Sequence, residues 1–266
     1  MSRLEQIFDR CKREERKALV IFASCGCPTM SDSEILIGDA IENGADIIEL
    51  GVPFSDPMAD GKVIQAASQV ALSNGADFGK ILELAGRLRR KYPEAGLIIF
   101  SYFNVLLSYG LERAAAAMAK QGVDGVLTVD LPLEERGELS GICEAANLSL
   151  IPLVSPSTSP DRAAKIVAGA TGFVYCVTVR GVTGERGELP AELRERLTRL
   201  RQLSPVPVLA GFGIADGKSA RAAGADADGV VVGSAAVRIC NGPDALPEKR
   251  KKLGSLVSEL AAALKK

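Results

Sequence analysis

Two carboxylates, Glu49 and Asp60, are the side chains in this sequence whose type and placement best suit acid–base chemistry. The apolar run at residues 46–50 predicts a buried strand that ends beside Glu49. A proline-containing loop with Asp60 follows, and helical periodicity resumes at residue 62. A carboxylate near the end of a buried strand is costly unless it is paired or used. Two carboxylates that converge on one pocket can transfer protons, and the sequence contains no histidine that could do so instead.

The composition describes a folded protein with a large core and no general attraction to nucleic acid or lipid. Its 32 basic residues nearly balance 33 acidic ones, so no net field draws in a polyanion or a membrane surface. Aromatic residues make up only 5% of the chain and tryptophan is absent, which argues against a base-stacking surface. No apolar run approaches the roughly 18 residues of a membrane span. The charged, amphipathic first 17 residues do not resemble a signal peptide, so we expect a cytoplasmic protein.

The six cysteines predict neither a metal site nor a disulfide framework. Cys25 and Cys27 form a C-x-C pair, but no second cluster and no histidine completes a set of four ligands. Scattered thiols in a chain of this size are typical of a reducing compartment.

Short apolar runs alternate with amphipathic segments from residue 18 onward. The runs are rich in β-branched residues and do not alternate with polar ones, as expected of strands buried on both faces of a parallel sheet. The eight predicted strands span residues 18–24, 46–50, 96–102, 125–129, 148–154, 173–179, 206–210 and 229–232. Helices are predicted at residues 31–43, 62–90, 111–121, 133–147, 160–168, 191–203, 215–223 and 245–265, and an apolar stripe at Leu4, Ile7, Phe8 and Cys11 predicts one more at the N-terminus.

Eight strand–helix units in 266 residues predict a single domain, residues 1–266, folded as a closed (β/α)8 TIM barrel with an extra N-terminal helix. A weak repeat supports this prediction: the segments 43–50, 121–129 and 223–232 each place a glycine at a predicted helix end and then an acidic residue before a strand. An open doubly wound sheet is the alternative. The dinucleotide-binding glycine fingerprint is missing after the first strand, which disfavours it.

Active sites of such barrels lie at the carboxyl ends of the strands. This rule places Glu49, Asp60, Tyr102, Asp130 and Tyr175 on or near one mouth.

Glycine-rich turns follow the last three predicted strands, at residues 180–188, 210–217 and 232–237. Backbone amides at such turns and at helix N-termini bind phosphate, and barrels repeatedly place a phosphate site after strands 7 and 8. The sequence therefore predicts a phosphate-ester substrate, with the turn at 180–188 acting either as a mobile lid or as an ordinary solvated loop. The donors we expect are Gly184, Gly213, Gly233 and Ser234.

Four motifs follow one another along the chain: ELGVPFSDPMADG (residues 49–61), GVTGER (181–186), AGFGI (210–214) and DGVVVGSAAV (228–237). They resemble the α-chain family of tryptophan synthase, and the similarity runs through essentially the whole chain. The resemblance implies a lyase that splits indole-3-glycerol phosphate into indole and glyceraldehyde 3-phosphate by retro-aldol cleavage, without metal or organic cofactor.

Glu49 and Asp60 match the two catalytic carboxylates of that family. Glu49, the more buried position, would hold and transfer the proton, and the Asp60 carboxylate would hold the indole N–H and stabilise its developing positive charge. The resemblance further implies that residues around the indole and glycerol parts form the substrate site. These residues are Phe22, Tyr102, Tyr175 and Phe212, with Thr183 ordering its loop against Asp60.

Members of the family pair with a pyridoxal-phosphate β chain, as an αββα tetramer, and pass indole to it. Asp56 and Asn104 match positions near that contact. The sequence departs from the family where proline is usual, at Lys62, Val105 and Leu133, and has Cys27 where aspartate is common.

Three other functions compete with this one. A free-standing indole-3-glycerol-phosphate lyase would need no β chain, and a non-catalytic activator of a β chain would not need both Glu49 and Asp60. Another phosphate-binding barrel, such as an isomerase or indole-glycerol-phosphate synthase, would use a lysine or cysteine near the strand ends, and no lysine lies inside the eight predicted strands.

Overall fold

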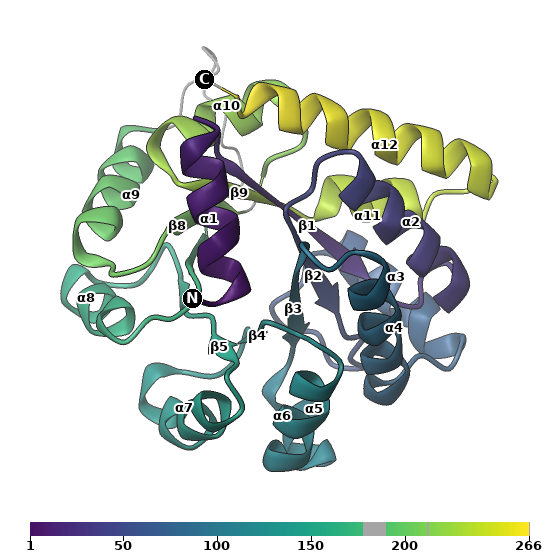
Figure 1. Ribbon diagram of the computed structural model, residues 1–266, viewed down its shortest axis with the longest axis horizontal. Helices are drawn as coiled ribbons and strands as arrows, with labels where there is room; N and C mark the ends of the chain where they lie inside the picture. Colours follow the sequence, from purple (N-terminus) through teal and green to yellow (C-terminus); the bar gives the residue numbers. More distant parts are fainter. Residues whose placement is uncertain (178–189, 212, 266) are drawn as a thin grey trace.

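The chain folds into a barrel of parallel strands surrounded by helices (Figure 1). The structure, a computed structural model, describes residues 1–177, 190–211 and 213–265. Hydrogen-bonded neighbours follow the order β5-β4-β3-β2-β1-β9-β8-β7-β6. The strands are β1 (Ala18–Ser24), β2 (Ile47–Gly51), β3 (Gly96–Ser101), β4 (Gly125–Thr128), β5 (Ser149–Leu150), β6 (Leu153–Val154), β7 (Val174–Val177), β8 (Val208–Gly211) and β9 (Gly229–Val232).

The fifth predicted strand, residues 148–154, closes the barrel but is divided in two. Its first half, β5, pairs with β4, and its second half, β6, pairs with β7. Pro152 lies between the halves and has no N–H to donate to a ladder, yet its carbonyl accepts a hydrogen bond from Tyr175 N at 2.9 Å. The ladder therefore runs on from β4 to β7, and the (β/α)8 TIM barrel is confirmed.

Helices follow the strands and form an outer layer (Figure 1). The prediction of one helix at residues 62–90 is wrong: two helices replace it. Gly75 adopts a φ of +71° after the first helix, and the Asp77 side chain caps the second by accepting from Lys80 N at 2.9 Å. The helices are α1 (Arg3–Arg13), α2 (Met30–Glu42), α3 (Lys62–Ser73), α4 (Phe78–Lys91), α5 (Phe103–Tyr109), α6 (Leu111–Lys120), α7 (Arg136–Ala145), preceded by the 3-10 turn η1 (Leu133–Glu135), α8 (Pro160–Ala168), α9 (Ala191–Leu203), α10 (Gly217–Asp226), α11 (Ser234–Cys240) and α12 (Leu246–Ala263).

Two of the three repeat glycines end their helices as predicted, and the third does not. Gly44 and Gly122 have φ values of +113° and +73° just after α2 and α6. Gly224 lies inside α10 instead. A Cβ there would come within 2.8 Å of Leu264 Cδ2, so this glycine permits close packing rather than a helix stop.

The amphipathic helix α1 packs against the barrel interior. Its apolar stripe joins one core cluster with inward-facing residues of the strands: Leu4, Ile7, Phe8, Cys11, Ala18, Val20, Ile47, Ile98, Leu127, Ile151, Phe173, Tyr175, Leu209 and Val231. A second, larger cluster fills the space between the strands and the outer helices. The extra N-terminal helix of the sequence prediction is thus confirmed. None of the helices in the described ranges is both long enough and apolar enough to cross a membrane.

Candidate active site

Glu49 lies on β2, inside the barrel, and is completely buried. It is flanked in register by Phe22 on β1 and Ile98 on β3. Neither of its carboxyl oxygens has a hydrogen-bond partner in the described part of the chain. Burial alone raises the pKa of Glu49 from its ordinary value of 4.5 to about 8. Near neutral pH this group is therefore a carboxylic acid that still holds its proton.

Two aromatic side chains, Phe22 and Tyr175, lie near this carboxyl. The Phe22 ring meets the Phe100 ring edge to face, with centroids 4.9 Å apart. It occupies space that a side chain at Gly51 would need, since a Cβ there would lie 2.5 Å from Phe22 Cζ. The pKa of Tyr175 is raised well above 10.0, first by burial and then by the nearby Glu49. The structure thus brings Phe22 and Tyr175 to the same region as Glu49.

Asp60 lies on the loop after β2 and is half-buried. Burial raises its pKa from 3.8 to about 6, while a hydrogen bond from Tyr102 partly opposes the rise. The buried Tyr102 hydroxyl also accepts from Ala59 N at 3.0 Å, and its ring stacks on Phe54 with centroids 5.0 Å apart. Tyr102 thus ties the loop that carries Asp60 to the end of β3. At neutral pH Asp60 is an anion, and Glu49 is not.

Gln65, on the first turn of α3, also holds this loop. Its Nε2 donates to the backbone carbonyl of Asp60 at 2.8 Å and to that of Pro57 at 3.3 Å. Asp60 N in turn donates to Pro57 O at 3.2 Å. None of the motifs in the sequence singles out Gln65. Its position five residues after Asp60, on a helix that begins at residue 62, was the signal that could have done so.

The expected phosphate donors lie on turns after the last two strands. Gly233 and Ser234 join β9 to α11, and a Cβ at Gly233 would lie 3.6 Å from Phe22 Cβ, so this turn borders the Phe22 ring. Gly213, after β8, has a φ of +78°, which favours glycine. The first amides of α11 have no carbonyl within their own helix to bond. Thr183, Gly184 and Phe212 lie outside the described residues, as does the turn at 180–188.

Asp56 and Asn104 are both exposed, on the loop after β2 and on α5 respectively. Apolar side chains near them in sequence are exposed as well: Met58 by 84% and Leu107 by 54%. Val105 N donates to Tyr102 O at 3.2 Å, a bond that the usual proline could not make.

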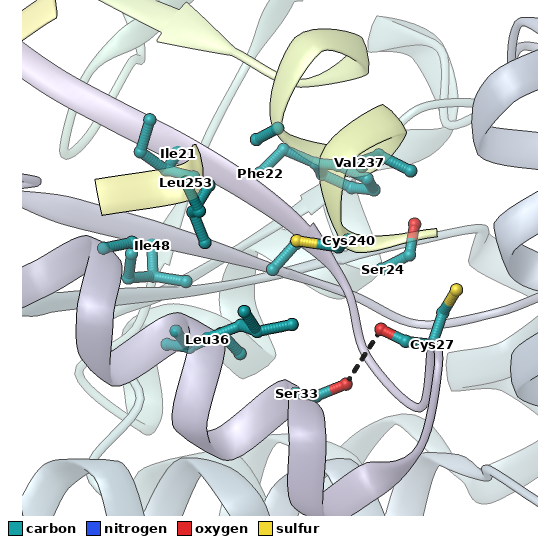
Figure 2. A pocket seen from close by; sticks show the side chains of 14 residues that line it. Ile21, Phe22, Ser24, Cys27, Ser33, Leu36, Ile48, Val237, Cys240 and Leu253 are labelled. Carbon is teal, nitrogen blue, oxygen red and sulfur yellow. Dashed lines mark hydrogen bonds between the residues drawn. The ribbon is translucent and has the colours of Figure 1, made fainter. Parts of the chain in front are cut away.

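A separate small cavity lies behind β1 (Figure 2). Its volume of about 20 Å³ is enough for roughly one water molecule and far too small for a substrate. Ser24 lines it, and its buried Oγ has no hydrogen-bond partner among the described residues, while Cys27 Sγ donates to Asn241 Oδ1 at 3.1 Å. Neither Glu49 nor Asp60 lines this cavity. Within the described ranges, no group of three or more acidic, cysteine or histidine side chains could hold a metal ion.

Comparison with known proteins places this chain in a family. A sequence profile of the family described as "Tryptophan synthase alpha chain" matches residues 8–265. The tryptophan synthase alpha chain of Geobacter sulfurreducens is 42% identical over 264 residues, covering 99% of both chains. A solved structure from Aquifex aeolicus VF5 has a TM-score of 0.92 at 36% identity and covers 100% of both chains. Tryptophan synthase subunit alpha from Legionella pneumophila has a TM-score of 0.90 at 31% identity, over 99% of this chain and 98% of that one.

Proposed function

Because this chain belongs to the tryptophan synthase α-chain family, we propose that it cleaves indole-3-glycerol phosphate into indole and glyceraldehyde 3-phosphate. The observation that carries the proposal is Glu49, a fully buried carboxyl with no hydrogen-bond partner in the described chain and a pKa of about 8. Such a group is unfavourable for folding, and proton transfer is a reason to keep it.

In the proposed mechanism, Glu49 gives its proton to the indole ring carbon that carries the glycerol chain. The resulting carboxylate takes a proton from the hydroxyl next to that carbon. The carbon–carbon bond then breaks, its electron pair returns to the ring, and the hydroxyl becomes the aldehyde of glyceraldehyde 3-phosphate. Glu49 ends protonated, as it began, so no further acid is consumed.

Asp60 acts as an anion, whereas Glu49 begins the reaction protonated and neutral. The Asp60 carboxylate accepts a hydrogen bond from the indole N–H and stabilises the positive charge that protonation creates on the ring. Support comes from its pKa of about 6 and from the contacts that hold its loop, made by Tyr102 and Gln65.

In this proposal the substrate is bound by side chains near Glu49 and Asp60. Phe22 and Tyr175, with Phe212, flank the indole and glycerol parts, and Tyr102 borders the same site. Thr183 orders its loop against Asp60. The phosphate is bound by the backbone amides of Gly184, Gly213, Gly233 and Ser234, and by the Ser234 hydroxyl.

The proposed partner is a tryptophan synthase β chain that receives the indole within an αββα tetramer. Support comes from the exposure of Asp56, Asn104, Met58 and Leu107 on the loop after β2 and on α5. We further propose that the chain acts in the cytoplasm as a single domain. Its six cysteines are all free, as expected in a reducing compartment.

The test is to follow indole release from indole-3-glycerol phosphate, with and without a tryptophan synthase β chain. Slow indole release by the chain alone, and a large rise in the rate when the β chain is added, would support both the lyase activity and the β-chain partner. Release unaffected by the β chain would indicate a free-standing lyase. The Glu49→Gln variant should release no indole, while Glu83→Gln, the same change on an exposed face of α4, should behave as the unaltered chain. No release by the unaltered chain under either condition would refute the lyase.

A further inference from the structure

A second hollow lies beside the barrel mouth, on the side away from β1. It has a volume of about 270 Å³ and is bordered by the end of β4, the segment after β6, and the helices α7 and α8. The two helices do not pack mainly on each other: α7 packs on α6, and α8 packs on α9. Leu131, Leu133 and Ile166 supply apolar walls to the hollow.

Two arginines line this hollow, and they differ in their bonding. Arg162 forms a two-pronged ion pair with Glu134, at 2.6 and 2.7 Å. Arg136 is half-buried, and it makes no hydrogen bond or ion pair with the chain at residues 1–177, 190–211 or 213–265. Burial lowers the pKa of Arg136, and no neighbouring carboxylate opposes that change. A partly desolvated guanidinium without an anion is unfavourable.

Thr128, the last residue of β4, presents a second unpaired polar group to the same hollow. It is only 7% exposed, and its hydroxyl has no hydrogen-bond partner within the described ranges. Valine would fill the same space without a polar atom. The hollow thus combines an unpaired cation, an unpaired hydroxyl and apolar walls. The Asp130 carboxylate also lines it, and there it accepts a hydrogen bond from Phe103 N at 2.7 Å.

We propose that this hollow binds a small organic anion. Its carboxylate or phosphate pairs with the Arg136 fork and the Thr128 hydroxyl, and its apolar body lies against Leu131, Leu133 and Ile166. The planar guanidinium suits either oxyanion, because both accept two parallel hydrogen bonds. The apolar walls favour an amphiphilic ligand over inorganic phosphate. This site does not include Glu49 or Asp60, so its existence does not depend on the proposed lyase activity.

The test uses three probes: benzoate, phenyl phosphate and inorganic phosphate. Each is titrated into the full chain while the Nε–H resonances of the arginines are followed by NMR, the Arg136 resonance being assigned by its loss in Arg136→Gln. We expect benzoate, phenyl phosphate or both to shift the Arg136 resonance saturably at millimolar concentrations, and inorganic phosphate to bind more weakly. The two organic probes distinguish a carboxylate ligand from a phosphate ligand.

Three variants make the test specific. Arg136→Gln should weaken binding of the organic probe about tenfold or more, and Thr128→Val by several-fold, since each removes a partner of the oxyanion. Arg199→Gln, the same charge change at an exposed arginine on α9, should bind as the unaltered chain. Circular dichroism would establish that all three fold. If neither organic probe shifts Arg136, or if Arg136→Gln and Arg199→Gln bind equally well, the proposal is wrong.

Discussion

Replacing Glu49 by glutamine should make the protein more stable, and the gain should depend on pH. Glutamine has nearly the same shape as a protonated glutamate but cannot ionise. In the native state Glu49 has a pKa of about 8, against 4.5 for an ordinary glutamate. In the unfolded chain the side chain meets water and recovers its ordinary pKa. The native state therefore binds this proton more tightly than the unfolded state does.

The sign and size of the effect follow from this difference. Below about pH 4.5 Glu49 is protonated in both states and carries no penalty. As the pH rises toward 8, unfolding releases the proton, so the native state loses about 1.4 kcal/mol per pH unit, and about 5 kcal/mol in all. Above about pH 8 the penalty is constant. The buried amide of glutamine adds a cost of its own, but that cost does not change with pH.

The assay is urea unfolding of the unaltered chain and of Glu49→Gln at a series of pH values. The difference in unfolding free energy should move in favour of the variant by about 4 kcal/mol between about pH 5 and pH 9. Glu83→Gln, at an exposed position, should run parallel to the unaltered chain. A difference between Glu49→Gln and the unaltered chain that stays constant with pH would refute the reasoning, because it would mean that Glu49 is already ionised in the native state.

Two further predictions concern turnover. Indole release should show a bell-shaped pH profile, because the mechanism needs Asp60 ionised and Glu49 protonated, and their pKa values are about 6 and about 8; a profile flat from about pH 5 to pH 9 would contradict these roles. Gln65→Leu removes two hydrogen bonds from the Asp60 loop, each contributing about 1 kcal/mol. It should lower kcat about tenfold and lower the free energy of unfolding by at most about 2 kcal/mol, whereas Gln69→Leu, one turn further along α3, should keep full kcat; equal rates for the two variants would show that Gln65 does not position Asp60.

Val105 stands where the resemblance in sequence leads us to expect proline, and the structure shows what its backbone N–H does there. With valine at position 105, the backbone N–H bonds Tyr102 O at the start of α5. The bond attaches that turn to the residue whose hydroxyl also holds Ala59. The loop after β2 and the start of α5 are therefore linked through Tyr102, next to the proposed β-chain surface.

The sequence by itself determined the number and order of strand–helix units. Apolar, β-branched runs and the glycines after α2 and α6 act locally, so their pattern can be read without knowing the fold. Closure of the barrel then places Glu49, Asp60 and Tyr175 toward one end, since parallel strands share one carboxyl end. Local patterns were less informative about Gly224 and about the break between α3 and α4. The first depends on a contact with the distant Leu264. The second is marked locally by Gly75 and Asp77, but the long amphipathic stretch around them hid this signal.

Only the tertiary structure decided the state of the titratable groups. The pKa of Glu49 depends on how completely neighbours from other strands exclude water and on whether any of them bonds its oxygens. Neither quantity is encoded near residue 49. The same holds for Arg136 and Arg162, which are indistinguishable as residue types. Arg162, on α8, is paired with Glu134 of η1, whereas Arg136, at the start of α7, faces the hollow without a carboxylate partner in the described residues.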